Sequence, residues 1–174
     1  MEEPENIRSI SLFNTWMWPL KGIRHFDTGD KVVSNRFGKF LYLQLNFSVR
    51  FMMRNSYADK KNLPDSVYHQ YLMPMQSRSA RWAAYSLAKS LVGENTHMEY
   101  LWQMRRHLIN IPMHMLWGMN DKFVPAEVLL PRWKENFCDK KFTEIKNTGH
   151  FVQEEAGEQL TREISEFVSN IPVV

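Results

Sequence analysis

Two polar residues directly follow short apolar stretches and could work together as a base and its orienting acid. Asp121 closes the segment Leu116–Asp121, and His150 lies in Asn147–Phe151, after a second apolar stretch. A carboxylate that accepts a hydrogen bond from one imidazole nitrogen fixes the tautomer of the ring. The other nitrogen is then free to take a proton from water or a hydroxyl group.

Each of the two residue types also has an ordinary structural role. An aspartate after a strand commonly caps the following turn, and a loop histidine is commonly just exposed to solvent. Residue type and position alone therefore leave both interpretations of Asp121 and His150 open.

The elements around this pair follow an alternating order. Hydrophobic patterning predicts short strands at residues 7–13, 112–117 and 141–145. Helical spacing, prolines and capping residues predict helices between and after them, at residues 64–74, 78–91, 96–108, 125–137 and 152–169. Alternating strands and helices indicate an α/β fold with three parallel strands and flanking helices. Ligands bind at the carboxyl ends of such strands, where Asp121 and His150 are expected.

Residues 37–53 carry two patterns at once. Leu41, Leu43, Leu45 and later apolar residues alternate with polar ones, which favours a strand. Phe37, Leu41 and Leu45 also stand at helical spacing. The pattern alone favours a strand here.

Composition excludes several classes of protein. The 174 residues carry a net charge of +3 with scattered basic residues and no nucleic-acid motif, so nucleic-acid binding is not expected. The single cysteine, Cys138, excludes an internal disulfide and a multi-cysteine metal cluster. The other five histidines lack ligand-like spacing, and His114, inside a strand, is expected to pack in the core. No membrane span or signal peptide is visible, so the expected location is the cytoplasm.

Two segments resemble a known family. Trp117–Lys122 and Gly149–Glu155 are similar to the acid and histidine loops of the α/β-hydrolase fold, within it most similar to haloalkane dehalogenase-like proteins. Pro4–Pro19 resembles the strand that leads into the helical cap of that family. The resemblance implies the last core strands plus a mostly helical cap insertion, and hence helices rather than a strand at residues 37–53.

The resemblance implies a two-step hydrolysis without metal or organic cofactor. An aspartate nucleophile displaces halide and forms an alkyl-enzyme ester, and a histidine then activates water to hydrolyse the ester. Asp121 and His150 match the family's catalytic acid and base. Trp16, Trp18 and Phe151 are candidates for lining the substrate pocket, although a packing role is at least as well founded for each.

The nucleophile of the family is not found among these residues. The sequence has no G-x-S-x-G or G-x-D-x-G elbow, no Asp-Trp pair and no His-Gly pair. The sequence is therefore expected to represent a hydrolase without its nucleophile half. A small apolar substrate is expected only where that half is supplied.

The same resemblance predicts the organisation of the chain. Residues 1–20 would form the first core strand and a hinge, residues 21–95 the helical cap, and residues 96–174 the C-terminal core. The strand at residues 7–13 would have an unpaired edge, which predicts self-association or a partner chain there. Two other functions stay open: a non-catalytic fragment or pseudoenzyme that acts as an interaction module, and an epoxide hydrolase.

Overall fold

The structure is a computed structural model that describes residues 6–172. The chain divides into two compact units. The sheet unit contains the described residues up to Trp16, the segment Ser56–Asn62 and the residues from Met104 onward; the helical unit contains Met17–Asn55 and Leu63–Gln103. The predicted organisation into residues 1–20, 21–95 and 96–174 remains a prediction, and it does not set Ser56–Asn62 apart from its surroundings.

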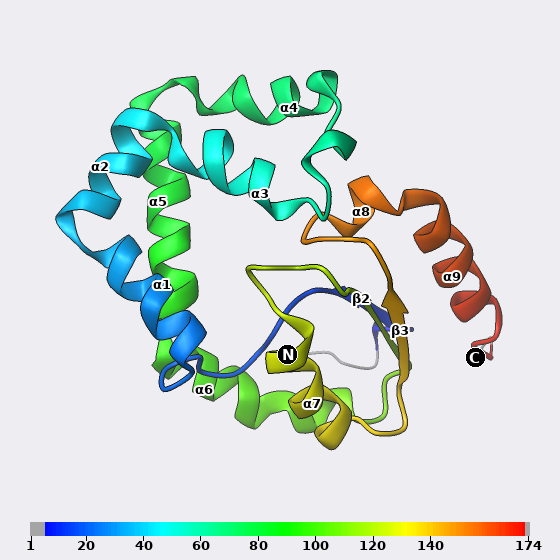
Figure 1. Ribbon diagram of the computed structural model, residues 1–174. Coiled ribbons are helices and arrows are strands. Elements are labelled where there is room, and N and C mark those ends of the chain that lie inside the picture. The colour runs from blue at the N-terminus through cyan, green and yellow to red at the C-terminus, as the bar shows by residue number, and fades with distance from the viewer. Residues whose placement is uncertain (1–5, 173–174) are drawn as a thin grey trace. The chain divides into compact units, whose positions relative to one another are not determined.

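The sheet unit is built on three parallel strands, as the sequence predicts (Figure 1). They are β1 (Ile10–Phe13), β2 (Met113–Gly118) and β3 (Lys141–Ile145), with β2 in the centre. All six residues of β2 are buried, whereas β1 is only partly buried along its length. This difference follows from their places in the sheet, because a central strand of a parallel sheet is covered on both faces and both edges.

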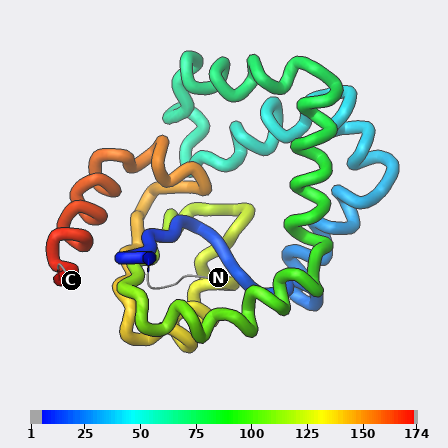
Figure 2. The backbone as a smooth tube through the Cα atoms, turned by 180° about the vertical axis from the view of Figure 1, so that it is seen from behind, coloured from blue at the N-terminus to red at the C-terminus, as the bar shows by residue number. Residues whose placement is uncertain are grey.

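Helices cover the sheet on two sides (Figure 1). The helix α7 (Ala126–Asn136) continues through Pro131, and α9 (Gly157–Ser169) lies on the other side of the strands. One core cluster joins strand and helix residues of this unit: Leu116, Ile145, Val152 and Leu160, with Phe13, Ala156 and Ile164 packed against them. Figure 2 shows the same strands from behind, running from the blue N-terminal strand to the orange third strand.

The C-terminal helical stretch differs from its prediction at one residue. The sequence predicts one helix over residues 152–169, but α8 (Val152–Glu155) ends at Ala156, whose backbone has φ −134° and ψ 29°, and α9 begins at Gly157. The apolar stripe survives the break, since Val152 and Leu160 still reach the same core cluster. The side chain of Glu155, directly before the break, turns back toward the loop of His150.

The helical unit confirms the resemblance-based expectation for residues 37–53 and not the strand pattern. Arg36–Leu45 forms α2, which ends at Asn46 in the left-handed conformation, and a π-helical turn follows over Ser48–Met53. Tyr42 and Leu43 of α2 pack with Tyr85 in the core of this unit, so burial on one side of a helix decides the structure. The remaining helices of the unit are α1 (Arg24–Ser34), the start of α3 (Arg54–Ser56), α4 (Asp65–Leu72), α5 (Arg78–Gly93) and α6 (Asn95–Gln103).

His114 has the packing role expected of a histidine within a strand. Its side chain is fully buried, and Nε2 lies 2.9 Å from the hydroxyl oxygen of Thr143 on β3. Burial lowers the pKa of His114 and the charge of Lys141 lowers it further, against the opposing charges of Glu163 and Glu166. A neutral His114 therefore belongs to the core of the sheet unit.

Within residues 6–172, none of the helices has the length and apolar character needed to cross a membrane.

Candidate active site

The loops that follow β2 and β3 bring Asp121 and His150 together. The carboxyl ends of parallel strands meet at one edge of a sheet, so residues that follow two neighbouring strands become neighbours. The Nδ1 atom of His150 lies 2.7 Å from Oδ2 of Asp121. The structure thus pairs the two residues that the sequence identified as candidate base and acid.

Two glycines allow backbone segments at the site to approach each other closely. A Cβ atom on Gly118 would lie 2.2 Å from the carbonyl oxygen of Gly149. A Cβ atom on Gly149 would lie 2.0 Å from the carbonyl oxygen of Ser56. A larger residue at Gly118 would push the loops of Asp121 and His150 apart, and one at Gly149 would push the His150 loop away from Ser56.

The carboxylate of Asp121 uses both of its oxygens. Oδ1 accepts hydrogen bonds from the backbone N–H groups of Phe123 and Val124, at 2.8 and 2.9 Å. Oδ2 accepts from Nδ1 of His150 and from the amide of Asn14, both at 2.7 Å. The side chain of Asp121 is completely buried, yet every hydrogen bond it receives favours the charged form.

These contacts keep Asp121 ionised. Burial by itself would raise the pKa of Asp121. The hydrogen bond and charge of His150, together with the donors Val124 and Asn14, outweigh burial and hold the pKa below its ordinary value. The orienting group beside His150 is therefore a carboxylate at neutral pH.

Asn14 is a site residue that the sequence analysis did not identify. Its Nδ2 donates to Oδ2 of Asp121 and, at 3.2 Å, to the carbonyl oxygen of Gly149. Its Oδ1 accepts from the N–H of Gly118 at 2.8 Å. One amide thus joins the ends of all three strands. The only signal that the sequence offers is an asparagine directly after a strand. In the structure this asparagine adopts φ 33°, a conformation that asparagine tolerates better than most residues.

We expect Asn14→Ala to lower the free energy of unfolding by about 1–3 kcal/mol, because it leaves the N–H of Gly118 and the carbonyl of Gly149 buried without their partner. Chemical denaturation followed by circular dichroism measures the change. Asn14→Gly is the matched comparison, since it removes the same amide but places no Cβ at a positive φ. Wild-type stability in both variants would show that these hydrogen bonds do not contribute.

The free side of His150 faces an aromatic and partly open environment. Its ring lies edge-on to Phe151 and Phe123, at centroid distances of 5.6 and 6.4 Å. The side chain is 36% exposed, and among the described residues Nε2 has no hydrogen-bond partner. With its Nδ1 proton donated to Asp121, the neutral ring presents the lone pair of Nε2 to whatever occupies this space.

The three candidate pocket residues have different surroundings. Phe151 packs against both His150 and Tyr57, the latter at 5.9 Å. Trp16 is partly buried at the end of the sheet unit's first segment. Trp18 is 1% exposed in the helical unit and packs edge-on against Trp102 at 5.2 Å. A substrate-lining role for these residues remains a prediction.

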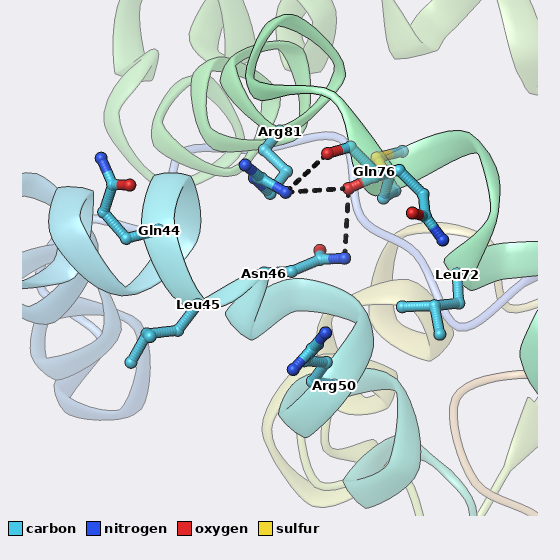
Figure 3. Close-up of a pocket in the computed structure, with 8 residues that line it drawn as sticks. Gln44, Leu45, Asn46, Arg50, Leu72, Gln76 and Arg81 are labelled. Atoms are coloured by element: carbon cyan, nitrogen blue, oxygen red, sulfur yellow. Dashed lines mark hydrogen bonds between the residues drawn. The ribbon is translucent and has the colours of Figure 1, made fainter.

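A separate hollow of about 150 Å³ lies within the helical unit (Figure 3). Arg81 and Asn46 line it and hold its wall together: Arg81 donates to the carbonyl oxygens of Leu43 and Gln76, and Asn46 donates to that of Met75. These bonds satisfy carbonyl groups at the end of α2 and before α5. Arg81 and the amide nitrogen of Asn46 therefore hold the neighbouring backbone segments of the helical unit together.

In the part of the chain that the structure describes, three or more histidine, cysteine, aspartate or glutamate side chains do not come together as a metal site. Cys138 is an exposed free cysteine.

No family model matches the sequence. Curated proteins match the sequence, among them Haloalkane dehalogenase 2 of Mycobacterium tuberculosis (strain H37Rv), which is 26% identical over 168 residues. The match covers 95% of this chain and 57% of the relative, and Haloalkane dehalogenase 2 of Mycobacterium bovis gives the same figures. The chain is thus similar in sequence to curated haloalkane dehalogenases. It spans little more than half the length of these relatives.

Solved structures show the same relationship in the fold. Haloalkane dehalogenase DbeA from Bradyrhizobium elkani USDA94 superimposes with a TM-score of 0.78 at 19% identity, covering 98% of this chain and 61% of that one. DatA from Agrobacterium tumefaciens C58 gives a TM-score of 0.77 at 16% identity, with the same coverage. The fold is therefore the C-terminal part of an α/β-hydrolase fold, as the sequence predicted.

Proposed function

We propose that this chain provides the base and the orienting acid of a haloalkane dehalogenase-like hydrolase. The observation that carries the proposal is the 2.7 Å contact between His150 Nδ1 and a buried, ionised Asp121, with Nε2 left open. The similarity in sequence to curated haloalkane dehalogenases supports the reaction class. The reacting carboxylate of such an enzyme would come from outside these 174 residues, which contain no nucleophile elbow.

The proposed chemistry has two steps. In the first, a carboxylate attacks a carbon that bears a halogen; the carbon–halogen bond breaks, halide leaves, and an alkyl ester forms. In the second, water adds to the ester carbonyl while Nε2 of His150 takes its proton. The ester C–O bond then breaks, and the alcohol leaves with the proton that His150 returns. The second proton of the water stays on the carboxyl group and is lost to solvent, which restores the carboxylate.

Asp121 acts in the second step through His150. While the ring is neutral, Asp121 holds the proton on Nδ1 and so keeps Nε2 as an acceptor. When Nε2 takes the proton of water, the buried negative charge stabilises the positive ring. Asn14 and the N–H groups of Phe123 and Val124 keep this charge in place.

The test uses the natural protein that carries these residues, with its intact mass recorded first. We expect bromide and alcohol to appear in equal amounts from 1-bromobutane. His150→Gln should lose this activity. His69→Gln is its matched control and should retain full activity, because His69 is exposed and its ring bonds to the Asp65 carbonyl of its own helix.

Two other results would replace the proposal. Diol formation from an epoxide such as styrene oxide, without halide release from bromoalkanes, would indicate an epoxide hydrolase. Neither activity in a folded protein would indicate a non-catalytic interaction module. Either result contradicts a dehalogenase function.

A further inference from the structure

The loop that carries His150 is packed against a segment from a distant part of the sequence. Ser56–Asn62 belongs to the sheet unit although the residues before and after it belong to the helical unit. The N–H of His150 donates to the carbonyl oxygen of Ser56 at 2.8 Å. Gly149 lies so close to this segment that a Cβ there would be 2.0 Å from Ser56 O and 2.8 Å from Ala58 N. The segment Ser56–Asn62 thus packs directly against the backbone of the His150 loop.

A single carboxylate fastens the loop to that segment. Oε1 of Glu155 accepts a hydrogen bond from the N–H of Gly149 at 2.7 Å, and Oε2 accepts from the N–H of Ala58 at 2.8 Å. Both oxygens are used, and each binds a different stretch of backbone. Hydrogen bonds from N–H groups to a charged carboxylate are stronger than those between neutral groups. Glu155 therefore joins two segments that are far apart in the sequence.

With this contact, the backbone that leads into His150 is held by three hydrogen bonds. The N–H of Gly149 binds Glu155, its carbonyl accepts from Asn14, and the N–H of His150 binds Ser56. The side chain of His150 makes one hydrogen bond that orients it, from Nδ1 to Asp121, beside its ring contacts with Phe123 and Phe151. Where the imidazole stands relative to Asp121 is consequently set by the position of this loop.

We propose that Glu155 is a positioning residue for His150: its carboxylate clips the His150 loop to Ser56–Ala58 and thereby holds Nδ1 of His150 on Asp121. This role rests on the proposed function, because His150 is the proposed base, but it concerns only how His150 is positioned. Glu155 does not touch the reacting atoms, and it acts through Gly149 and the loop.

The experiment follows the Nδ1 proton of His150 by nuclear magnetic resonance in the full chain and in Glu155→Gln. An imidazole proton shared with a carboxylate is shielded from water and gives a resolved downfield signal. Glutamine keeps the size of the side chain but has one acceptor oxygen, and its amide nitrogen would face an N–H donor. We expect the Nδ1 proton to exchange with water about tenfold faster or more in this variant, which corresponds to the loss of one charge-assisted hydrogen bond.

The matched control is Glu158→Gln, which removes the same charge from an exposed position three residues further on. It should leave the exchange rate unchanged. Glu155→Asp retains the charge but is one methylene shorter, so it should reach only one of the two N–H groups and give an intermediate rate. The fraction of His150 with its proton on Nδ1, read from the ring nitrogen shifts, should fall in Glu155→Gln and recover partly in Glu155→Asp. Thermal unfolding of each variant separates a local effect from a general loss of stability.

The proposal is overturned if the Nδ1 proton of His150 exchanges within twofold of wild type in Glu155→Gln. If Glu155→Gln does not fold, amide hydrogen exchange in the wild-type chain tests the proposal instead. The amide protons of Gly149 and Ala58 must then be protected from exchange, and free exchange of both would overturn the proposal. None of these readings requires substrate. A protein that fails to release halide but shows the expected exchange would therefore contradict the proposed function and leave the role of Glu155 standing.

Discussion

In the natural protein, His150→Gln is expected to release about one equivalent of halide per protein molecule and then to continue only at a greatly reduced rate. Halide leaves when the ester forms, and that step does not use the base. Hydrolysis of the ester does, because water must lose a proton to Nε2 as it attacks. A glutamine amide cannot take that proton, so steady-state turnover should fall by about 10²–10⁴-fold.

Rapid mixing with 1-bromobutane and mass spectrometry of the quenched protein measure both parts of this result. The variant should gain the mass of one butyl group, whereas wild type under turnover should carry it only in part. His69→Gln should turn over as wild type does. If His150→Gln sustains turnover, His150 is not the base. If it releases no halide at all and its fold is intact, the histidine is required before the ester step, contrary to the proposed order.

Several parts of the fold could be predicted because the signals for them are local. The three strands and the helices between them follow from apolar runs, prolines and caps within short windows of sequence. The pairing of Asp121 with His150 follows from one rule, that parallel strands end at a common edge. Residues 37–53 show the limit of this method. Their alternation favours a strand, and the helix is decided by packing of Tyr42 and Leu43 against Tyr85, more than 40 positions away in the sequence.

The support around the pair could not be predicted, because it depends on contacts between distant segments. Nothing in the neighbourhood of Asn14 reveals that its amide will reach both Asp121 and Gly149. Likewise, the sequence places Glu155 at the start of a helix and Ala58 between two helices, and only the fold brings them to 2.8 Å. Residue types that can do chemistry are visible in a sequence, whereas the groups that orient them become visible in three dimensions.

Asp121→Asn is expected to reduce ester hydrolysis by about 10²–10⁴-fold while the fold is retained. The reason lies in how the two carboxylate oxygens are used. Oδ1 accepts two backbone N–H groups, from Phe123 and Val124, so the oxygen of an asparagine amide would take that place. The amide nitrogen would then occupy the position of Oδ2, where it meets the donor Nδ2 of Asn14 and Nδ1 of His150.

An amide N–H at that position can donate to His150 only if Nδ1 has lost its proton. The neutral ring must then carry its proton on Nε2, the atom that has to accept one from water. Asp121→Asn thus leaves the base in place but in the wrong tautomer, and it removes the charge that stabilises the protonated ring. The ester should accumulate as it does in His150→Gln, with its rate of hydrolysis as the direct measurement.

Asp139→Asn is the matched control for this variant. It makes the same chemical change at a carboxylate whose side chain is 67% exposed and whose partner is Lys140, so hydrolysis should be unaffected. Nitrogen shifts of the His150 ring in Asp121→Asn should show the proton moved from Nδ1 to Nε2. Undiminished hydrolysis with that shift would mean that the tautomer does not limit the reaction. Undiminished hydrolysis without it would mean that Asp121 does not orient the ring, and the acid of the pair would have to be sought elsewhere.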